Sequence, residues 1–203
     1  MRLYTSPTTP FGRKPMVLIH EAHLTGRIQV TEVSGNPLDS GNLPIARNPL
    51  GKIPVLERPD GPAIYDSRVI CRFLDDLAQA GLYPAAPQLW QTLTLEATAD
   101  GILEAALAMV YETRMRPEDK RFPTWVDAQW AKIARALDAI ESDWIRHLAG
   151  PLDMAHIAVG CALGYLDFRL DARNWRLGHP ALAAWAADFA KRPSMLATAP
   201  PTL

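Results

Sequence analysis

The order of strand-like and helix-like segments along the chain limits its fold more than any other feature. Up to residue 79, short alternating or β-branched segments are interleaved with helical ones, whereas every later segment has the three- and four-residue apolar spacing of a helix. A proline-punctuated stretch, residues 80–87, separates the two parts. We therefore expect an α/β domain over residues 1–79, a linker over 80–87 and an all-helical domain over 88–203.

In the first part, turn and capping residues mark where the elements begin. Pro10 suits the first turn of a helix, and Asp66 or Ser67 suits the cap of a second one. A Gly/Pro/Asn-rich loop covers residues 34–51, and a turn at 59–62 divides two apolar segments. The order is thus β-α-β-loop-β-β-α, with strands expected at residues 3–5, 28–33, 53–57 and 63–65 and helices at 10–23 and 67–79.

The second part predicts helices only. Asp153 is a good N-cap, and Leu152 and Ile157 occupy the two positions of a hydrophobic staple around it. Pro193 is expected to end the last helix, because proline cannot continue the hydrogen-bond ladder. The expected helices cover residues 89–114, 125–147, 154–170 and 180–191.

Charge and apolar patterning exclude several classes of partner. The formal net charge is −1 and no block of like charge occurs, which argues against nucleic acid or an anionic membrane as the main partner. No apolar stretch reaches the ~18 residues of a membrane span, and the first residues meet prolines and polar side chains too early for a signal peptide. We expect a soluble protein of the cytoplasm.

Neither the cysteines nor the histidines predict a metal site. Cys71 and Cys161 lie far apart in helix-like segments, so we expect buried free thiols in a reducing compartment. His20 and His23 are three residues apart, but no third ligand accompanies them. No bound metal is therefore expected.

The most specific motif runs from Asn48 to Leu56. Pro54 opens a strand there and lacks an N–H group, so the backbone groups of Ile53 are left for another partner. A cis Ile53–Pro54 bond would turn those groups outward. The alternative interpretation is a rigid turn from loop to strand.

A second motif, Asp66-Ser67, stands where a strand ends and a helix begins. Helix N-termini offer unpaired N–H groups and a partial positive charge, which suit a carboxylate. Asp66 could bind the ammonium group of the same ligand while Ser67 binds its carboxylate. The pair thus fits an amino-acid-like ligand end, although simple helix capping explains it as well.

Together these motifs resemble the glutathione transferase family, specifically its bacterial serine/threonine-type cytosolic members. Residues 9–14 are similar to the family's first strand-to-helix turn, residues 48–56 to its cis-proline segment and residues 66–70 to its γ-glutamyl-binding signature. The resemblance extends over nearly the whole chain. It implies a thioredoxin-like N-terminal domain, an all-α C-terminal domain, a homodimer and glutathione as co-substrate.

The resemblance also implies roles for individual residues. Ile53 would pair its backbone with the cysteinyl part of glutathione, Lys52 would reach the glycine carboxylate, and Asp100 would reach the γ-glutamyl ammonium across a dimer interface. At the start of the third helix, Asp153 and His156 stand where the family has Ser or Thr and then Asp, which leaves the reciprocal capping bond open. The implied glutathione-binding residues are Thr9, Phe11, Lys52, Ile53, Pro54, Asp66, Ser67 and Asp100, and the implied electrophile pocket contains Met109, Tyr111 and Arg114.

The family activates the glutathione thiol with a hydrogen bond from a group near that first turn. Thr9 is the first candidate because it precedes Pro10 at the helix start, Thr8 is the second, Ser6 is possible, and Tyr4 lies too far back in the strand. No cysteine occurs at the turn, which disfavours a redox mechanism with a protein thiol.

The expected function is therefore a glutathione transferase whose bound thiolate attacks a hydrophobic electrophile or a peroxide, as in detoxification. Two alternatives stay open. The chain could be a glutathione-binding module without turnover, or a glutathione-dependent isomerase or disulfide reductase.

Overall fold

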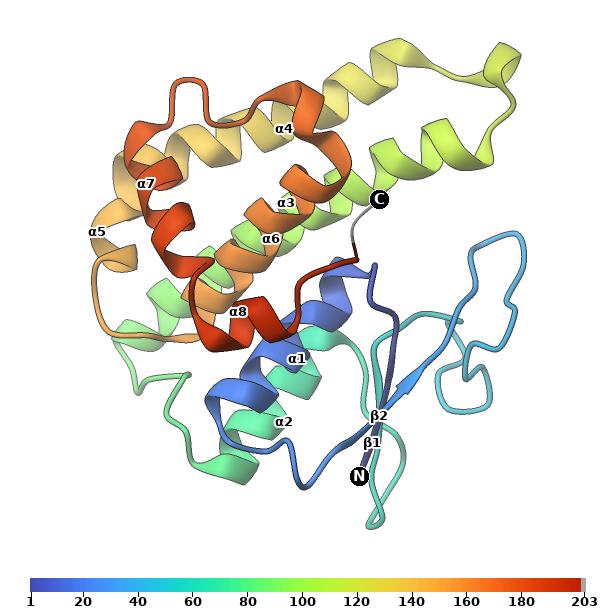
Figure 1. Cartoon of the computed structure of the whole chain (residues 1–203), viewed down its shortest axis with the longest axis vertical. Helices are drawn as coiled ribbons and strands as arrows, with labels where there is room; N and C mark the ends of the chain where they lie inside the picture. The colour runs from blue at the N-terminus through green and yellow to red at the C-terminus, as the bar shows by residue number, and fades with distance from the viewer. Residues whose placement is uncertain (202–203) are drawn as a thin grey trace. The chain divides into compact units, whose positions relative to one another are not determined.

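The computed structural model describes residues 1–201. The chain forms two compact units (Figure 1), of which the first contains residues 1–83 and the described residues from Pro193 onward, and the second is Pro84–Arg192. The structure thus differs from the expected ranges, because the end of the chain belongs with the first unit. The helical unit is an insertion in the first one.

The first unit is built on a three-stranded sheet of order β2-β1-β3. Strand β1 pairs in parallel with β2 and antiparallel with β3. The parallel pair needs a crossover, which helix α1 provides. Val17 and Leu18 of α1 are fully buried, as are Leu3 and Leu56 of the sheet. The elements of this unit are β1 (Arg2–Thr5), α1 (Pro10–Glu21), β2 (Gln29–Glu32), β3 (Val55–Glu57), α2 (Ser67–Ala78) and α8 (Pro193–Ala197).

The strand predicted at residues 63–65 is not formed. Only Ile64 pairs with β3, through two backbone hydrogen bonds of 2.8 and 2.9 Å to Leu56. Pro62 has no N–H group to extend the ladder, and Asp66 already caps α2. The turn at residues 59–62 and the start of α2 are thus too close in the sequence for a longer strand to form between them.

The prediction for Pro193 was also wrong, because this residue begins a helix instead of ending one. Helix α8 follows it, and proline is well tolerated in a first turn. The Arg13 guanidinium of α1 donates to the Met195 carbonyl at 3.0 Å and lies 3.5 Å from the Thr198 hydroxyl. The Ser194 hydroxyl donates to the Glu21 carboxylate. These contacts attach α8 to α1.

The second unit is helical throughout its described residues. Helix α6 is its centre, since twelve of its residues are buried and it packs chiefly against α3. The helix predicted at 125–147 is interrupted by a π-helical turn, so it ends early and resumes as a short helix. The elements are α3 (Gln88–Met115), η1 (Glu118–Lys120), α4 (Pro123–Ala139), η2 (Ile140–Trp144), α5 (Ile145–Leu148), α6 (Met154–Leu170), η3 (Asp171–Arg173) and α7 (Pro180–Phe189).

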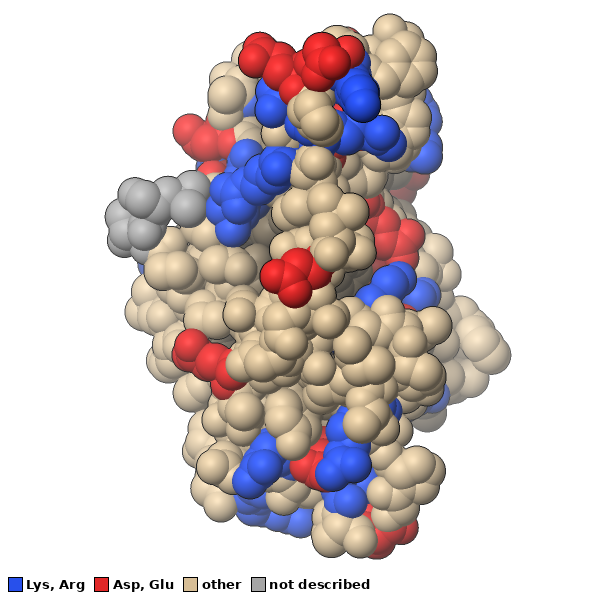
Figure 2. Space-filling model, turned by 90° about the vertical axis from the view of Figure 1, so that its right-hand side faces the viewer, with Lys and Arg blue, Asp and Glu red and all other residues tan. Residues whose placement is uncertain are grey.

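Charged residues are mixed over the surface drawn in Figure 2. Lys and Arg side chains stand next to Asp and Glu side chains there, with wide uncharged areas between them. Across residues 1–201, no helix combines the length and the apolar character that a membrane crossing requires.

Candidate functional site

Three segments of the first unit meet at one end of its sheet. In the antiparallel β1–β3 pair, Tyr4 lies opposite Val55, so the residue after Tyr4 and the residue before Val55 lie at the same end. The bridge between Leu56 and Ile64 is also antiparallel, which carries the chain from Ile64 toward that end as it approaches α2. The register therefore brings together the 6–9 turn, Ile53–Pro54 and Asp66–Ser67.

Two helices begin at this end of the sheet. Helix α1 starts at Pro10, directly after the turn, and α2 starts at Ser67; the two helices also pack against each other. Each helix N-terminus presents N–H groups without intrahelical partners and a partial positive charge. An anionic or amino-acid-like ligand is electrostatically favoured at such a place.

The loop before β3 is held by Asn48, which is 2% exposed. Its side-chain amide donates to the Lys52 carbonyl at 2.8 Å, and its amide oxygen accepts from the Leu50 N–H at 3.1 Å. The Ile53–Pro54 bond, left open by the sequence, is cis. Asn48 was noted only as the first residue of the motif, and its burial shows that it organises the segment.

The four candidate hydroxyls of the turn differ in their present partners. Ser6 and Thr8 lie 3.2 Å apart, with either hydroxyl able to donate, and the Tyr4 hydroxyl donates to Glu57 at 2.9 Å. Thr9 is the N-cap residue of α1 by position, but its side chain makes no capping hydrogen bond. The Thr9 hydroxyl is thus not committed to the helix it precedes.

Gly12 brings α1 close to the end of β1. A Cβ atom at this position would lie 1.9 Å from the Thr5 hydroxyl oxygen and 2.7 Å from the Thr9 methyl carbon. Any side chain would therefore push Thr9 away from its present place. The sequence interpretation included Gly12 in the turn motif without assigning it this spacing role.

At the start of α2, the two predicted ligand residues lie in different environments. The exposed Asp66 carboxylate caps the helix by accepting from the Arg68 N–H at 3.0 Å, and its other oxygen lies 3.4 Å from the Arg68 guanidinium. Ser67 is 3% exposed and belongs to the first turn. Capping is thus observed for Asp66, and its exposure leaves the carboxylate accessible to a ligand as well.

The remaining predicted residues are divided between the two units. Phe11 is half-buried and Lys52 is exposed in the first unit, while Asp100 is buried on α3 in the second. Met109 is 2% exposed, so it packs in the helical core and we leave it out of the proposed pocket. Tyr111 is half-buried and Arg114 is exposed near the end of α3.

Sequence interpretation missed two side chains that accompany Tyr111 and Arg114. Tyr165 and Arg169 lie near the end of α6, which packs against α3. Residues three or four apart share one face of a helix, so this spacing could have paired Tyr111 with Arg114 and Tyr165 with Arg169. The spacing could not have predicted that the two pairs lie near each other, because that depends on how α3 packs against α6.

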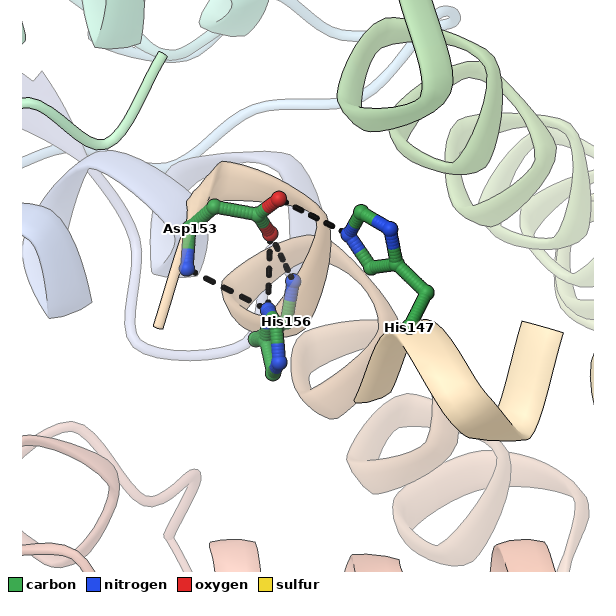
Figure 3. Close-up of side chains that lie close together, drawn as sticks. All are labelled: His147, Asp153 and His156. Carbon is green, nitrogen blue, oxygen red and sulfur yellow. Dashed lines mark hydrogen bonds and ion pairs between the residues drawn. The ribbon is translucent and has the colours of Figure 1, made fainter. Parts of the chain in front are cut away.

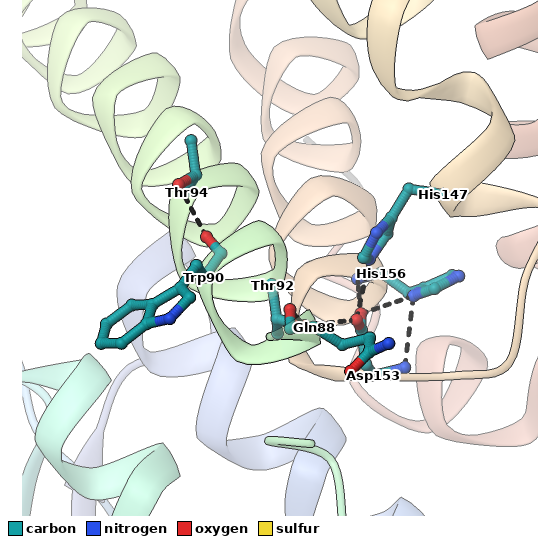
Figure 4. Close-up of polar contacts among 7 residues, drawn as sticks. All are labelled: Gln88, Trp90, Thr92, Thr94, His147, Asp153 and His156. Carbon is teal, nitrogen blue, oxygen red and sulfur yellow. Dashed lines mark hydrogen bonds and ion pairs between the residues drawn. The ribbon is translucent and has the colours of Figure 1, made fainter. Parts of the chain in front are cut away.

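A cluster of His147, Asp153 and His156 is the set of described residues that could hold a metal ion, with ligand atoms within 4.8 Å of one another (Figure 3). The Asp153 carboxylate already accepts from the Thr92 hydroxyl at 2.7 Å and the His156 N–H at 3.3 Å, and lies 2.8 Å from His147 Nε2 (Figure 4). The Asp153 oxygens therefore already have partners within the protein. We interpret the cluster as a structural feature that holds the start of α6.

Burial alone would raise the pKa of the Asp153 carboxyl. Hydrogen bonds from His156 and Thr92 and the nearby His156 and His147 outweigh burial, and the pKa falls to about 2. His156 Nδ1 lies 2.7 Å from the carboxylate and 3.2 Å from the Asp153 backbone nitrogen, and it cannot donate to one and accept from the other at once. The shorter distance to a charged acceptor favours donation to the carboxylate.

Comparison with known proteins gives a consistent result for both units. Residues 8–77 match the glutathione S-transferase N-terminal domain, and residues 123–188 match the glutathione S-transferase C-terminal domain. An uncharacterised GST-like protein of Escherichia coli K12, YibF, is 32% identical over 99% of both chains.

Solved structures agree with these matches. A glutathione transferase family member from Pseudomonas fluorescens Pf-5 with bound glutathione superimposes with a TM-score of 0.96 at 43% identity, over 99% of both chains. A second structure of such a member from this organism, with bound S-(propanoic acid)-glutathione, gives a TM-score of 0.92 at 43% identity over 100% of both chains. The chain therefore belongs to the glutathione S-transferase family and has its thioredoxin-like and all-helical domains.

Proposed function

We propose that this protein is a glutathione transferase that binds glutathione in the first unit and activates its thiol for attack on an electrophile. The observation that carries the proposal is the meeting of the 6–9 turn, Ile53–Pro54 and Asp66–Ser67 at one end of the sheet. Relatives at 43% identity that contain glutathione or a sulfur-substituted glutathione support it.

In this proposal each segment binds a different part of glutathione. Asp66 takes the γ-glutamyl ammonium, and Ser67 with the α2 N-terminus takes its carboxylate. The backbone of Ile53 pairs with the cysteinyl residue, as in a short added strand. Lys52 reaches the glycine carboxylate, Phe11 and Pro54 border the bound peptide, and Asp100 is assigned to the ammonium in a homodimer.

Thr9 then keeps the sulfur ionised. A free thiol has a pKa of about 8.5, so little thiolate exists at neutral pH. A hydroxyl donor together with the α1 N-terminus can lower that pKa by about one to two units, or about 1.4 to 2.7 kcal/mol. The thiolate sulfur forms a bond to the electrophilic carbon while the leaving group departs with its electron pair.

Protein-thiol redox chemistry is disfavoured by the placement of both cysteines. Cys71 and Cys161 have 0% exposure and neither is part of a disulfide, in agreement with the sequence interpretation. Neither lies at the 6–9 turn. A homodimer, a cytoplasmic location and a role in detoxification stay predictions from the family resemblance.

The proposal is tested by the ultraviolet thiolate absorbance of bound glutathione as a function of pH. Thr9→Ala should raise the apparent pKa of the bound thiol by about one unit, with a matching loss of turnover on an aryl halide. Thr9→Ser, which keeps the hydroxyl, is the matched control and should behave like the wild type. Normal ionisation in Thr9→Ala would move the role to Thr8 or Ser6, which the corresponding variants then examine.

Normal ionisation in Thr9→Ala, Thr8→Ala and Ser6→Ala alike would contradict activation by a hydroxyl of the turn. Tight glutathione binding without turnover of aryl halides or peroxides would instead favour a binding module. Activity only with maleylacetoacetate or hydroxyethyl disulfide would favour an isomerase or reductase.

A further inference from the structure

The last residue of strand β1 has a buried side chain to which the proposed function gives no role. Thr5 is 4% exposed, and its hydroxyl oxygen has no hydrogen-bond partner within residues 1–201. Its backbone is held in place, because the Thr5 carbonyl accepts from the Val33 N–H at 2.8 Å. Since the hydroxyl has no partner there, the Thr5 side chain contributes through the space that it fills.

Gly12, in the first turn of α1, lies against this side chain. Glycine forms helices less readily than alanine, and the φ angle of Gly12 is not in the left-handed region, so the backbone conformation does not require glycine. A Cβ atom at this position would lie 1.9 Å from the Thr5 hydroxyl oxygen and 3.2 Å from the Thr5 Cβ atom. The Thr5 side chain therefore fills the space that a side chain at residue 12 would need.

The methyl group of Thr9 borders the same space. Its carbon lies 2.7 Å from the Cβ position at Gly12, which is shorter than a van der Waals contact allows. The methyl and hydroxyl groups of a threonine occupy different staggered positions about the Cα–Cβ bond. The Thr9 hydroxyl thus points in another direction, and it makes no capping hydrogen bond with α1 either.

The backbone of Thr9 is held on both sides. Its N–H donates to the Ser6 carbonyl at 3.2 Å, and its carbonyl accepts from the Arg13 N–H at 3.2 Å. With these groups fixed, the torsion about the Cα–Cβ bond decides where the hydroxyl lies. A β-branched residue has few rotamers, so the space in which its methyl group lies can select one of them.

We infer that Thr5 and Gly12 are positioning residues for Thr9. We call these two residues the Thr9 floor: together they leave room for the Thr9 methyl group, and so direct the Thr9 hydroxyl toward the sulfur of bound glutathione. A hydrogen bond weakens steeply when its donor is turned away, so the floor influences the pKa of the bound thiol through the direction of that hydroxyl. The assignment rests on the proposed function.

The main test is the ultraviolet thiolate absorbance of bound glutathione as a function of pH. In Gly12→Ala the added methyl group meets Thr5 and displaces the Thr9 side chain, so the ionisation constant of the bound thiol should fall about tenfold. In a Thr9→Ala background no hydroxyl is left to direct, and Gly12→Ala should cause no further change. An equal fall in both backgrounds would overturn the inference, because Gly12 would then act without Thr9.

Gly26→Ala is the matched control for the exchange of glycine for alanine. Gly26 lies in the same unit, and a Cβ atom there would meet nothing within 4 Å. Bound glutathione should therefore ionise in this variant as in the wild type. A fall as large as that in Gly12→Ala would show that the effect does not come from the floor.

Thr5 supplies a second test that does not depend on the folding of Gly12→Ala. Thr5→Gly empties part of the floor and frees the Thr9 torsion, so the ionisation constant should fall about threefold. The conservative variant Thr5→Val fills the same space without a hydroxyl and should recover the wild-type value. Normal ionisation in Thr5→Gly, or an equal fall in Thr5→Gly and Thr5→Val, would overturn the inference.

S-methylglutathione, whose sulfur cannot ionise, separates positioning from loss of the whole site. The wild type, Gly12→Ala and Thr5→Gly should bind it with affinities within about twofold of one another, as measured by calorimetry. A loss of this affinity as large as the loss of ionisation would make the floor a structural feature only and overturn the inference.

The outcomes also distinguish the floor from the proposed function. No binding of S-methylglutathione by the wild type would refute the proposed glutathione site, and the floor with it. A raised thiol pKa in Thr9→Ala with normal ionisation in Gly12→Ala would leave the transferase and refute the floor alone.

Discussion

The two ends of the α3–α6 helix pair differ in the partners that they give to the enclosed atoms of a charged side chain. At the beginning, Thr92 of α3 donates to Asp153 at the start of α6, and this carboxylate is surrounded by donors. At the end, the Arg169 guanidinium has an enclosed nitrogen with no acceptor in the described chain. At the first end the carboxylate oxygens are used by neighbouring donors, whereas at the second end one guanidinium nitrogen has no acceptor among the described residues.

Partners are not complete at the first end either. His156 shows that even the first end is not fully satisfied, because its Nε2 atom is buried without a partner in the described structure. That atom points away from Asp153 (Figure 3), so it does not share in binding the carboxylate. A histidine nitrogen without a partner can be a neutral acceptor, which costs less than an unsatisfied charged donor.

The largest effect on this comparison is expected from Asp153→Ala. The change leaves the Thr92 hydroxyl and the His156 N–H without their acceptor and removes the α6 cap, so the free energy of unfolding should fall by about 3 kcal/mol or more. Urea unfolding measures it. Asp188→Ala, at an exposed ion pair with Lys191, is the control and should leave the unfolding midpoint unchanged. A similar small effect in both variants would mean that Asp153 does not support the helix pair.

An intermediate effect is expected from acid. The folded pKa of Asp153 is about 2 against an ordinary value of 3.8, so its charge stabilises the fold above pH 3.8 and that contribution is lost as the pH falls toward 2. The loss amounts to about 2 kcal/mol. The stability difference between wild type and Asp153→Asn should shrink over this range. A difference that is constant from pH 5 to pH 2 would contradict the assigned partners.

The smallest effect is expected from Arg169→Met. The change removes the enclosed Nη1 donor, which has no acceptor among the described residues, but it also loses the hydrogen bond with Tyr165 and the contact with Phe168, so the free energy of unfolding should stay within about 1 kcal/mol of the wild type. Arg176→Met should be slightly destabilising, because it breaks two bonds to Asp167. A large loss for Arg169→Met in urea would show that Arg169 is structural and that the two ends are alike.

Local signals in the sequence predicted the helix starts well. Helix α6 covers residues 154–170 as expected, because Asp153 caps it, and α1 and α2 begin where Pro10 and Asp66 place them. The family resemblance predicted the domain types, which the comparisons confirm. These features depend on neighbours within a few residues or on a motif of fixed spacing.

Features that depend on distant residues were not predicted. The Thr92–Asp153 bond joins residues 61 positions apart, and the approach of Tyr165 and Arg169 to the end of α3 depends on the packing of α3 against α6. The absent strand at 63–65 and the added helix α8 show the same limit, since pairing and docking decide them. The glutathione residues stay predictions, because register shows which segments meet but not what they bind.

Helix α8 has a consequence for how the protein is made. The contacts that Arg13 makes with Met195 and Thr198 join parts of the first unit that are separated by the whole helical insertion. During synthesis, residues 1–83 leave the ribosome long before the residues of α8 exist. The α8-binding surface of α1 therefore stays uncovered until the whole helical insertion and α8 itself have been synthesised.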